Sequence, residues 1–314
     1  MAMTPATNTT TEAAAGALSH PRSDPSIHSS DWAACRFLTC SVLPVRMACN
    51  LACPFCFSKS SISSLKSDKA DWSRLDVERY YEFAAHRGAT RLVITGGGEP
   101  LLDAESTLSL IERAQTWFRE IALFTNGTCL SRRLAERLAE AGLSYICYSR
   151  HHDDDESCRR LMGGSAPRLG DFLTAAGPLK IRATCVMTRG YIDSTAAVDR
   201  YIARLGDLGV REFTFKHTYV AYDYSVFANS PHDEWARRHQ VQRDPFVGCG
   251  QVIAELPWGP QIRQVGEYQV CYYFEPNPLW EQEHQLCRSS NLLSDGCVYA
   301  SLEDRRSLLF RLSG

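Results

Sequence analysis

The feature that most restricts the fold of this sequence is a regular alternation of short apolar runs with helix-like segments after residue 35. Strand-like runs are expected at residues 36–45, 91–95, 120–124, 143–149, 180–187 and 210–216, and helices at 75–86, 107–118, 131–141 and 196–208. Apolar strands separated by helices of this length are typical of βαβ units with a parallel sheet. Six units are too few for the eight-stranded barrel, so the sequence predicts an α/β fold with a partial, open TIM-like (βα)6 barrel.

The chain divides into three stretches by composition. Residues 1–34 are rich in Ala, Thr, Ser and Pro without periodicity, which predicts a disordered tail. Residues 35–218 hold the expected barrel. In residues 219–314 the rhythm changes: residues 267–274 alternate like a strand, and Ser294-Asp295-Gly296 is typical of a hairpin turn. We therefore expect residues 219–314 to be a β-containing extension that covers the substrate.

Composition excludes some functional classes. A net charge of −2 over 314 residues gives no strongly basic surface for nucleic acid. The sequence contains no run of eighteen apolar residues, so it predicts no membrane span. Residues 1–30 contain no basic segment followed by an apolar one, so no secretory signal is visible and a cytoplasmic protein is expected. Thirteen cysteines, an odd number, argue against a complete disulfide framework. The thiols are then expected to be reduced.

Three of these cysteines, Cys49, Cys53 and Cys56, fall within eight residues just after the first expected strand. Thiolates at this density favour iron–sulfur or zinc over hard cations, and three thiolates on a [4Fe–4S] cluster leave one iron without a protein ligand. Zinc usually takes two CxxC pairs or a Cys/His pair, and a redox CxxC would leave Cys49 idle. Three unrelated free cysteines are the remaining alternative. The spacing favours an iron–sulfur cluster.

Two further motifs accompany the cysteines. The pattern Cys-x3-Cys-x-Φ-Cys has Phe55 at the Φ position, Gly97-Gly98-Glu99-Pro100 follows the second expected strand, and Thr125-Asn126-Gly127 follows the third. Together, in this order, they resemble the radical S-adenosylmethionine (SAM) superfamily. The resemblance covers residues 36–218.

The resemblance implies a cofactor arrangement. Cys49, Cys53 and Cys56 hold one [4Fe–4S] cluster, and the unligated iron binds the amino and carboxylate groups of SAM. One electron, from a donor such as flavodoxin or ferredoxin, cleaves the sulfonium C–S bond, and the resulting 5′-deoxyadenosyl radical abstracts hydrogen from the substrate. A primary carbon radical needs shielding from water and oxygen.

The resemblance also implies a set of SAM contacts. The glycines let the backbone approach the methionyl ammonium, the glutamate accepts a hydrogen bond nearby, and the aromatic residue packs near the adenine or the cluster. The polar residues at strand ends contact the SAM carboxylate or ribose. A turn, a cap or a core position is the alternative for each residue. The expected contacts are Phe55, Gly97, Gly98, Glu99, Asn126 and Ser149.

Further polar residues follow expected strands. Arg150 and His151 come after the fourth strand and are candidates for contact with SAM or substrate, whereas the acids at 153–156 are typical of a helix start. Lys216 and His217 end the sixth strand and are candidate substrate anchors.

The function predicted is that of a radical SAM enzyme that removes hydrogen from a small molecule, plausibly in specialised biosynthesis, with its reaction type and catalytic acid or base open. A peptide-modifying radical SAM enzyme is the second hypothesis, and a non-catalytic metal-binding module is the third. The widely spaced C-terminal cysteines are expected to be buried free thiols rather than ligands of an auxiliary cluster. They are Cys249, Cys271, Cys287 and Cys297.

Overall fold

A computed structural model describes residues 31–65, 69–223 and 225–313. Twelve strands form one sheet in the order β12-β11-β10-β1-β2-β3-β4-β5-β6-β9-β8-β7. The strands are β1 (Arg36–Leu43), β2 (Arg91–Ile94), β3 (Glu120–Thr125), β4 (Tyr145–Ser149), β5 (Ile181–Val186), β6 (Glu212–Lys216), β7 (Gln251–Glu255), β8 (Gln261–Val265), β9 (Tyr268–Tyr273), β10 (Leu286–Leu293), β11 (Cys297–Tyr299) and β12 (Leu308–Arg311).

Helices connect the strands much as the sequence predicts. The α-helices are α1 (Val77–His86), α2 (Ala104–Ala114), α3 (Arg132–Glu140), α4 (Asp155–Met162), α5 (Leu169–Ala176), α6 (Thr195–Gly206), α7 (Pro231–His239) and α8 (Pro278–Glu283). Short 3₁₀ turns are η1 (Asp31–Ala34), η2 (Phe57–Ser60), η3 (Ile62–Ser64), η4 (Pro100–Asp103) and η5 (Arg305–Ser307). Capping side chains set several starts: Asp76 accepts from the Arg79 amide and begins α1, and Asp103 accepts from Ser106 and begins α2 three residues earlier than predicted.

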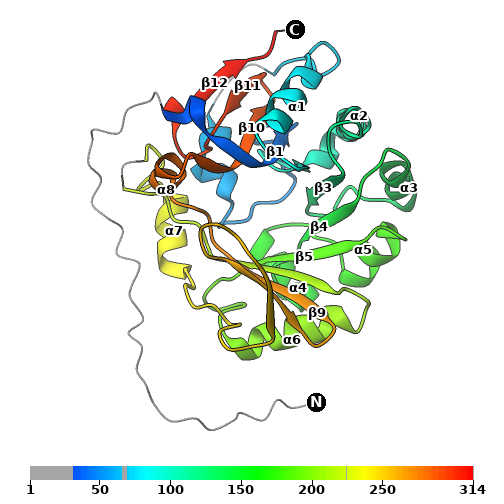
Figure 1. Cartoon of the computed structure of the whole chain (residues 1–314). Coiled ribbons are helices and arrows are strands. Elements are labelled where there is room, and N and C mark those ends of the chain that lie inside the picture. Colours follow the sequence, from blue (N-terminus) through cyan, green and yellow to red (C-terminus); the bar gives the residue numbers. More distant parts are fainter. Residues whose placement is uncertain (1–30, 66–68, 224, 314) are drawn as a thin grey trace.

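The predicted open parallel barrel is confirmed. Strands β1 to β6 pair in parallel and in chain order, and the sheet curls into a crescent with α1, α2, α3, α5 and α6 on its outer side (Figure 1). Alternate strand residues such as Ile146, Ala183 and Phe213 belong to the apolar core between sheet and helices. The intervening residues face the interior of the crescent, because side chains alternate across a strand.

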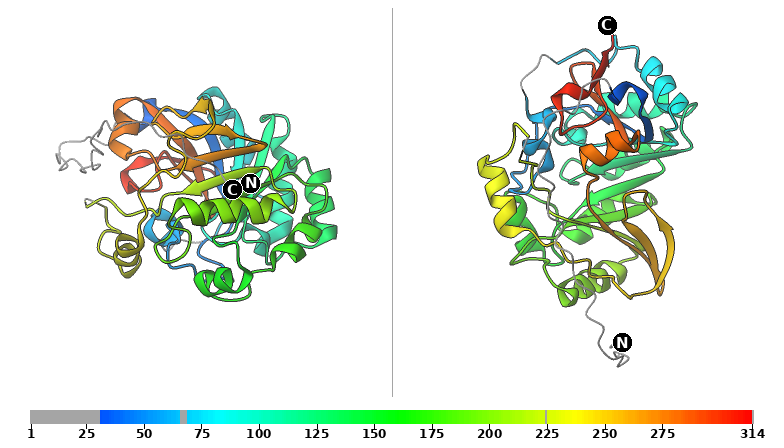
Figure 2. Two further views of the ribbon diagram at one scale, coloured as in Figure 1. Left: turned by 90° about the horizontal axis from the view of Figure 1, so that it is seen from below. Right: turned by 60° about the vertical axis from the view of Figure 1, so that its left-hand side comes forward.

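The C-terminal third does not sit apart from the barrel. Strand β9 pairs in parallel with β6, and β10 pairs in parallel with β1, so residues 219–314 lengthen the parallel sheet at both edges. Both ribbon figures show the strands β10 to β12, at the red end of the colour bar, beside the blue first strand (Figures 1 and 2). The predicted turn at 294–296 joins β10 to antiparallel β11. Residues 35–218 and residues 219–314 therefore contribute strands to the same sheet, although the composition of the sequence changes near residue 218.

The segment between β9 and β10 spans the open side of the crescent. These strands stand at opposite ends of the parallel part of the sheet, and α8 lies in the link that connects them. In Figure 1, α7 and α8 lie on the side away from α2 and α3. Within the described residues, β9 and β10 are therefore joined by this connecting segment and not by strand pairing.

The predicted tail needs one correction. Residues 1–30 lie outside the described residues, but residues 31–34, the last four of the expected tail, form η1. Trp32 is only 2% exposed and belongs to the apolar core, because burial of a large aromatic side chain favours order in this segment. In the part of the chain that the structure describes, no helix is long and apolar enough to cross a membrane.

Candidate functional site

The cysteine loop, residues 44–56, leaves the C-terminal end of β1. Cys49 is exposed, whereas Cys53 and Cys56 are half-buried, and all three are free thiols. Burial raises the pKa of Cys53, and the neighbouring Cys56 and Cys49 raise it further through like-charge repulsion. The three sulfurs therefore lie within electrostatic reach of one another at one end of the barrel.

The cysteine loop packs directly on the glycines that follow β2. A Cβ on Gly97 would lie 2.3 Å from the Val45 carbonyl oxygen, and one on Gly98 would lie 2.0 Å from that of Ala48. Gly97 also has φ +110°, which a side chain rarely permits. In this structure the glycines are needed because the backbone of the cysteine loop approaches them, a reason other than the predicted approach of SAM. Contact with SAM stays a prediction.

Glu99 joins the ends of β2 and β3. It is only 2% exposed. Its Oε1 accepts from the Thr125 hydroxyl at 2.6 Å and the Leu101 amide at 3.1 Å, and its Oε2 accepts from the Asn126 amide at 2.8 Å. Burial raises the pKa of Glu99, while these donors favour the charged form. The carboxylate already has three protein donors, so its direct role here is to fix the turn that carries Asn126.

Asn126 reaches from that turn to the cysteine loop. Its Nδ2 donates to Asn50 Oδ1 at 3.0 Å and lies 3.8 Å from Cys49 Sγ. Asn50 in turn donates to the Thr128 hydroxyl at 2.6 Å and lies 3.8 Å from Cys129 Sγ. Sequence reasoning missed Asn50, Thr128 and Cys129, although Thr128 and Cys129 directly continue the Thr-Asn-Gly motif.

Phe55, the aromatic residue of the cysteine motif, belongs to a buried ring cluster. It is 8% exposed and meets His151 edge to face, with 4.5 Å between ring centroids. Trp235 of α7 lies 6.3 Å from Phe55, so α7 forms part of this wall. The wall links the cysteine loop to the end of β4, and α7 is a contributor that no sequence signal indicated.

His151 is held as a neutral imidazole. Its Nδ1 accepts from the Val186 amide at 2.9 Å, which leaves the ring proton on Nε2. Burial lowers the pKa of His151 to about 3, and the cations Lys216 and Arg150 lower it in the same direction. Nε2 has no hydrogen-bond partner among the described residues. His151 can therefore donate one hydrogen bond at the mouth of the barrel.

The residues beside His151 point in different directions. Ser149 is half-buried on the inner face of β4, as expected for a ligand contact. Arg150 is fully buried, and its Nη2 pairs with Asp155 at 2.6 Å, so it anchors the start of α4. Its Nε and Nη1 have no hydrogen-bond partner among the described residues, and contact with a ligand stays a prediction. Asp154 caps α4, which confirms the predicted helix start.

Two further residues that follow Cys56 hold the loop in place. Lys59 donates to the Cys53 carbonyl at 3.3 Å, and the Ser58 hydroxyl accepts from the Gly97 amide at 3.3 Å. Sequence reasoning did not single them out, although their position within three residues of a motif cysteine is a usable signal. Lys59 also opposes the rise in the pKa of Cys53 through its positive charge.

The two candidate substrate anchors at the end of β6, Lys216 and His217, point to opposite faces of the sheet. Lys216 faces the barrel interior, since its charge acts on His151 and on Cys147 of β4. His217 faces away from this interior, toward Tyr272 and Gln240.

The four C-terminal cysteines lie in four different places along the chain: before β7, in β9, in β10 and in β11.

The cysteine loop suits an iron–sulfur cluster. A single metal ion needs its ligands to converge on one point, and within residues 31–65, 69–223 and 225–313 no three His, Cys, Asp or Glu side chains do so. Thiolates on a four-iron cube bind different iron atoms and stand further apart. Three free thiols on one loop, with one of them exposed, can supply the three thiolates that such a cube requires.

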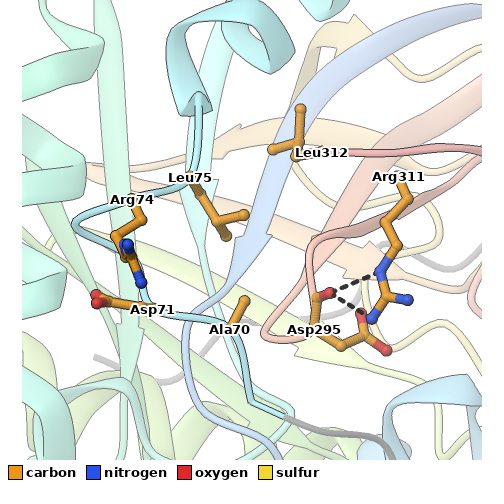
Figure 3. Close-up of a pocket in the computed structure, with 7 residues that line it drawn as sticks. All are labelled: Ala70, Asp71, Arg74, Leu75, Asp295, Arg311 and Leu312. Atoms are coloured by element: carbon orange, nitrogen blue, oxygen red, sulfur yellow. Dashed lines mark hydrogen bonds between the residues drawn. The ribbon is translucent and has the colours of Figure 1, made fainter. Parts of the chain in front are cut away.

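A hollow between the segment that precedes α1 and the ends of β10 and β12 contains none of the predicted site residues (Figure 3). It is lined by Ala70, Asp71, Arg74, Leu75, Asp295, Arg311 and Leu312. Arg311 donates to the Asp295 carbonyl at 3.3 and 3.2 Å, and the Asp295 carboxylate pairs with Arg46 at 3.5 Å. The partners of these groups come from the protein itself, so the hollow is not a candidate for the site.

Comparison with known proteins agrees with the geometry at the cysteine loop. The family model described as the Radical SAM superfamily matches residues 44–188. The GTP 3′,8-cyclase of Aquifex aeolicus is 31% identical over 166 residues, which are 50% of this chain and 51% of that protein. The chain thus spans about half the length of this curated relative.

Solved structures share the fold. Streptococcus suis SuiB bound to S-adenosylmethionine superposes with a TM-score of 0.55 at 16% identity, over 85% of this chain and 60% of that one. SuiB bound to the precursor peptide SuiA gives a TM-score of 0.54 at 15% identity over the same shares. At these identities the likeness concerns the fold alone.

Proposed function

Since this chain belongs to the radical SAM superfamily of enzymes, which use a [4Fe–4S] cluster and SAM, we propose that it removes a hydrogen atom from a small-molecule substrate. The observation that supports this most is the position of three free thiols on one loop at the mouth of an open parallel barrel. Catalytic residues of such barrels lie at the C-terminal ends of the strands. Cys49, Cys53 and Cys56 would hold the cluster there.

When bound, the cluster and SAM supply the one-electron cleavage and the radical that abstracts hydrogen. The chain's own residues position that chemistry. Gly97 and Gly98 accommodate the cysteine loop, and Glu99 fixes the turn from which Asn126 contacts Asn50. Each of these supports acts on the backbone or side chains next to the thiols, so the loop is held before any cofactor binds.

The walls of the mouth exclude water. Phe55, His151 and Trp235 form a continuous ring surface above the strand ends. Exclusion of water protects a reactive carbon radical from side reactions. We assign Phe55 to the side of the cluster and the Nε2 hydrogen of His151 to a ligand acceptor.

Anaerobic reconstitution with iron and sulfide tests the proposal. We expect about four irons per chain, because a four-iron cluster binds the three cysteines, and we expect 5′-deoxyadenosine to form from SAM with dithionite or reduced flavodoxin. Cys53→Ala should lose both the bound iron and the cleavage, while its far-UV circular dichroism stays that of the unsubstituted protein. Cys249→Ala is the matched control, because this half-buried free thiol lies outside the motif, before β7.

Two results would count against the proposal. One is a single zinc per chain without SAM cleavage, which would favour a non-catalytic metal-binding module. The other is normal SAM cleavage by Cys53→Ala, which would remove the assigned ligand. About eight irons per chain would instead correct the number of clusters.

A peptide substrate is the second candidate, and it rests on the edge strand β7. All five residues of β7 are exposed, and β7 is the last strand of the sheet in the described part of the chain, so one of its edges is unpaired there. Extended peptides can add to such an edge. Ile253→Lys, which places a charge on this edge, should abolish turnover of a peptide and leave turnover of a small molecule unchanged.

A further inference from the structure

Three polar side chains beside the cysteines form a closed ring of hydrogen bonds. Asn126 Nδ2 donates to Asn50 Oδ1 at 3.0 Å, Asn50 Nδ2 donates to the Thr128 hydroxyl at 2.6 Å, and that hydroxyl donates to Asn126 Oδ1 at 2.6 Å. Each member therefore donates to one neighbour and accepts from the other. Hydrogen bonds linked in this way polarise one another, so the ring holds its members more firmly than three separate bonds would.

The backbone fixes the direction in which the Asn126 amide points. The Thr128 backbone N–H, which can only donate, lies 2.9 Å from Asn126 Oδ1. If the amide were reversed, its NH2 group would meet this donor and the ring would be broken. The turn is also held, because the Asn126 backbone donates to Glu99 at 2.8 Å and the Gly127 backbone donates to the Thr125 hydroxyl at 3.0 Å. Nδ2 is therefore directed at the cysteine loop.

The remaining N–H of the Asn126 amide meets Cys49. A side-chain amide has two donors and one oxygen with two lone pairs. Thr128 uses both lone pairs and Asn50 takes one donor, while Nδ2 lies 3.8 Å from Cys49 Sγ. The Leu51 backbone also donates to this sulfur. Since Asn126 is only 7% exposed, water does not compete freely for its amide, and every hydrogen-bonding group of the side chain is in use.

The surroundings of Cys53 differ from those of Cys49. Cys53 Sγ lies 3.7 Å from the Met162 carbonyl oxygen, which is an acceptor. Lys59 donates to the Cys53 carbonyl and not to its sulfur. Among residues 31–65, 69–223 and 225–313, a side-chain N–H is bonded to a motif sulfur only at Cys49. The donor thus acts on the most exposed of the three sulfurs.

A donor on a ligand sulfur affects the reduction potential of the cluster. The reduced cluster carries one negative charge more than the oxidised one, and its sulfurs share this charge. Hydrogen bonds to the sulfurs are one of the factors that set the potential of iron–sulfur proteins. An N–H directed at Cys49 stabilises the reduced state more than the oxidised state, because more strongly charged acceptors form stronger hydrogen bonds. The potential therefore becomes less negative.

We propose that Asn126 is a positioning residue of the cluster and not a contact of SAM: its amide, oriented by the hydrogen-bond ring, donates to Cys49 Sγ and makes the cluster easier to reduce. The inference rests on the proposed function, because it assumes a [4Fe–4S] cluster on the three cysteines. A reduced flavodoxin or ferredoxin supplies the electron and is itself oxidised by one electron; no covalent bond forms or breaks in this step. For Asn126, this role replaces the contact with the SAM carboxylate or ribose that the sequence predicts.

The midpoint potential of the reconstituted full chain, measured by EPR-monitored titration without SAM, tests this inference. Asn126→Leu keeps the approximate volume of the side chain and removes both N–H groups. We expect a more negative midpoint, with the ratio of reduced to oxidised cluster at a fixed potential lowered severalfold, up to about tenfold, or about 59 mV for one electron. Thr128→Val should give a smaller shift in the same direction, because it opens the ring but keeps the backbone N–H that orients Asn126.

The affinity for SAM separates this role from a direct SAM contact. In anaerobic calorimetry on the same preparations, the Kd for SAM should change by less than about threefold in Asn126→Leu, since loss of a direct hydrogen bond to a charged group would raise it by roughly tenfold or more. Thr174→Val, which removes an exposed hydroxyl of α5, is the matched control for Thr128→Val and should change neither quantity.

An unchanged midpoint in Asn126→Leu would overturn the inference, and a Kd for SAM raised about tenfold at that unchanged midpoint would assign Asn126 to SAM instead. If Asn126→Leu binds no iron, the midpoint of Thr128→Val decides: a negative shift supports the inference and an unchanged value overturns it. Loss of the cluster in both variants would give the ring a purely structural role and also overturn the inference. An unsubstituted protein that does not bind about four irons refutes the proposed function instead.

Discussion

The two faces of β4, β5 and β6 differ in a way that separates stability from function. On the outer face, side chains such as Phe213 are buried against helices and contribute to one continuous apolar core. On the inner face, the Thr184 hydroxyl has no partner among the described residues, and Lys216 pairs with Glu275. Adjacent residues of one strand thus have opposite roles. The outer face gains free energy by excluding water, whereas the inner face retains bonding capacity for a ligand.

The largest expected effect comes from Gly98→Ala at the mouth of the barrel. The added Cβ would lie 2.0 Å from the Ala48 carbonyl oxygen, so the cysteine loop must move. We expect iron binding and SAM cleavage to fall by about 100-fold, as for other supports of metal ligands. Iron analysis and 5′-deoxyadenosine formation measure this. Gly170→Ala is the control, because nothing lies within 4 Å of the added atom; equal activity of both variants would show that the glycine is not needed.

Phe213→Ala should have the next largest effect, on stability. Phe213 is 2% exposed on the outer face, so its removal leaves a cavity and should lower the free energy of unfolding by about 3–5 kcal/mol. Thr214→Val, one residue along on the inner face, should change it by less than about 1 kcal/mol. Urea unfolding compares the two variants. Similar losses in both would contradict the division between the faces.

The smallest expected effect is a change in pH dependence in His151→Gln. The pKa of His151 is lowered from 6.5 to about 3 in the folded protein, so the unfolded chain binds more protons between these values. The contribution of this neutral imidazole to stability is therefore fully present above pH 6.5 and decreases as the pH falls toward 3. Glutamine keeps an acceptor for the Val186 amide but does not titrate.

Unfolding by urea between pH 3.5 and 7.5 measures this difference. The slope of stability against pH should be shallower in His151→Gln than in the unsubstituted protein. His284→Gln, at an exposed position, should leave the slope unchanged. A parallel loss of stability at every pH would instead assign His151 a packing role alone.

Much of the barrel could be predicted from the sequence because its order is local. Strands β1 to β6 were predicted to within a few residues, since each is a short apolar run bounded by turn residues. The motif cysteines were also predictable by their spacing. The reason for Gly97 and Gly98 was not, because the groups that approach them, Val45 and Ala48, are about fifty residues away in the chain.

The sequence by itself determined the alternation of strands and helices, the parallel order of β1 to β6, and the placing of three thiols on one loop, because each depends on neighbours within a few residues. Only the tertiary structure decided that β9 and β10 extend the sheet at opposite edges, that Glu99 supports Asn126, and that Glu275 pairs with both Lys216 and Arg288. These contacts join residues far apart in the chain, and the packing of the whole barrel, not local preference, selects among them.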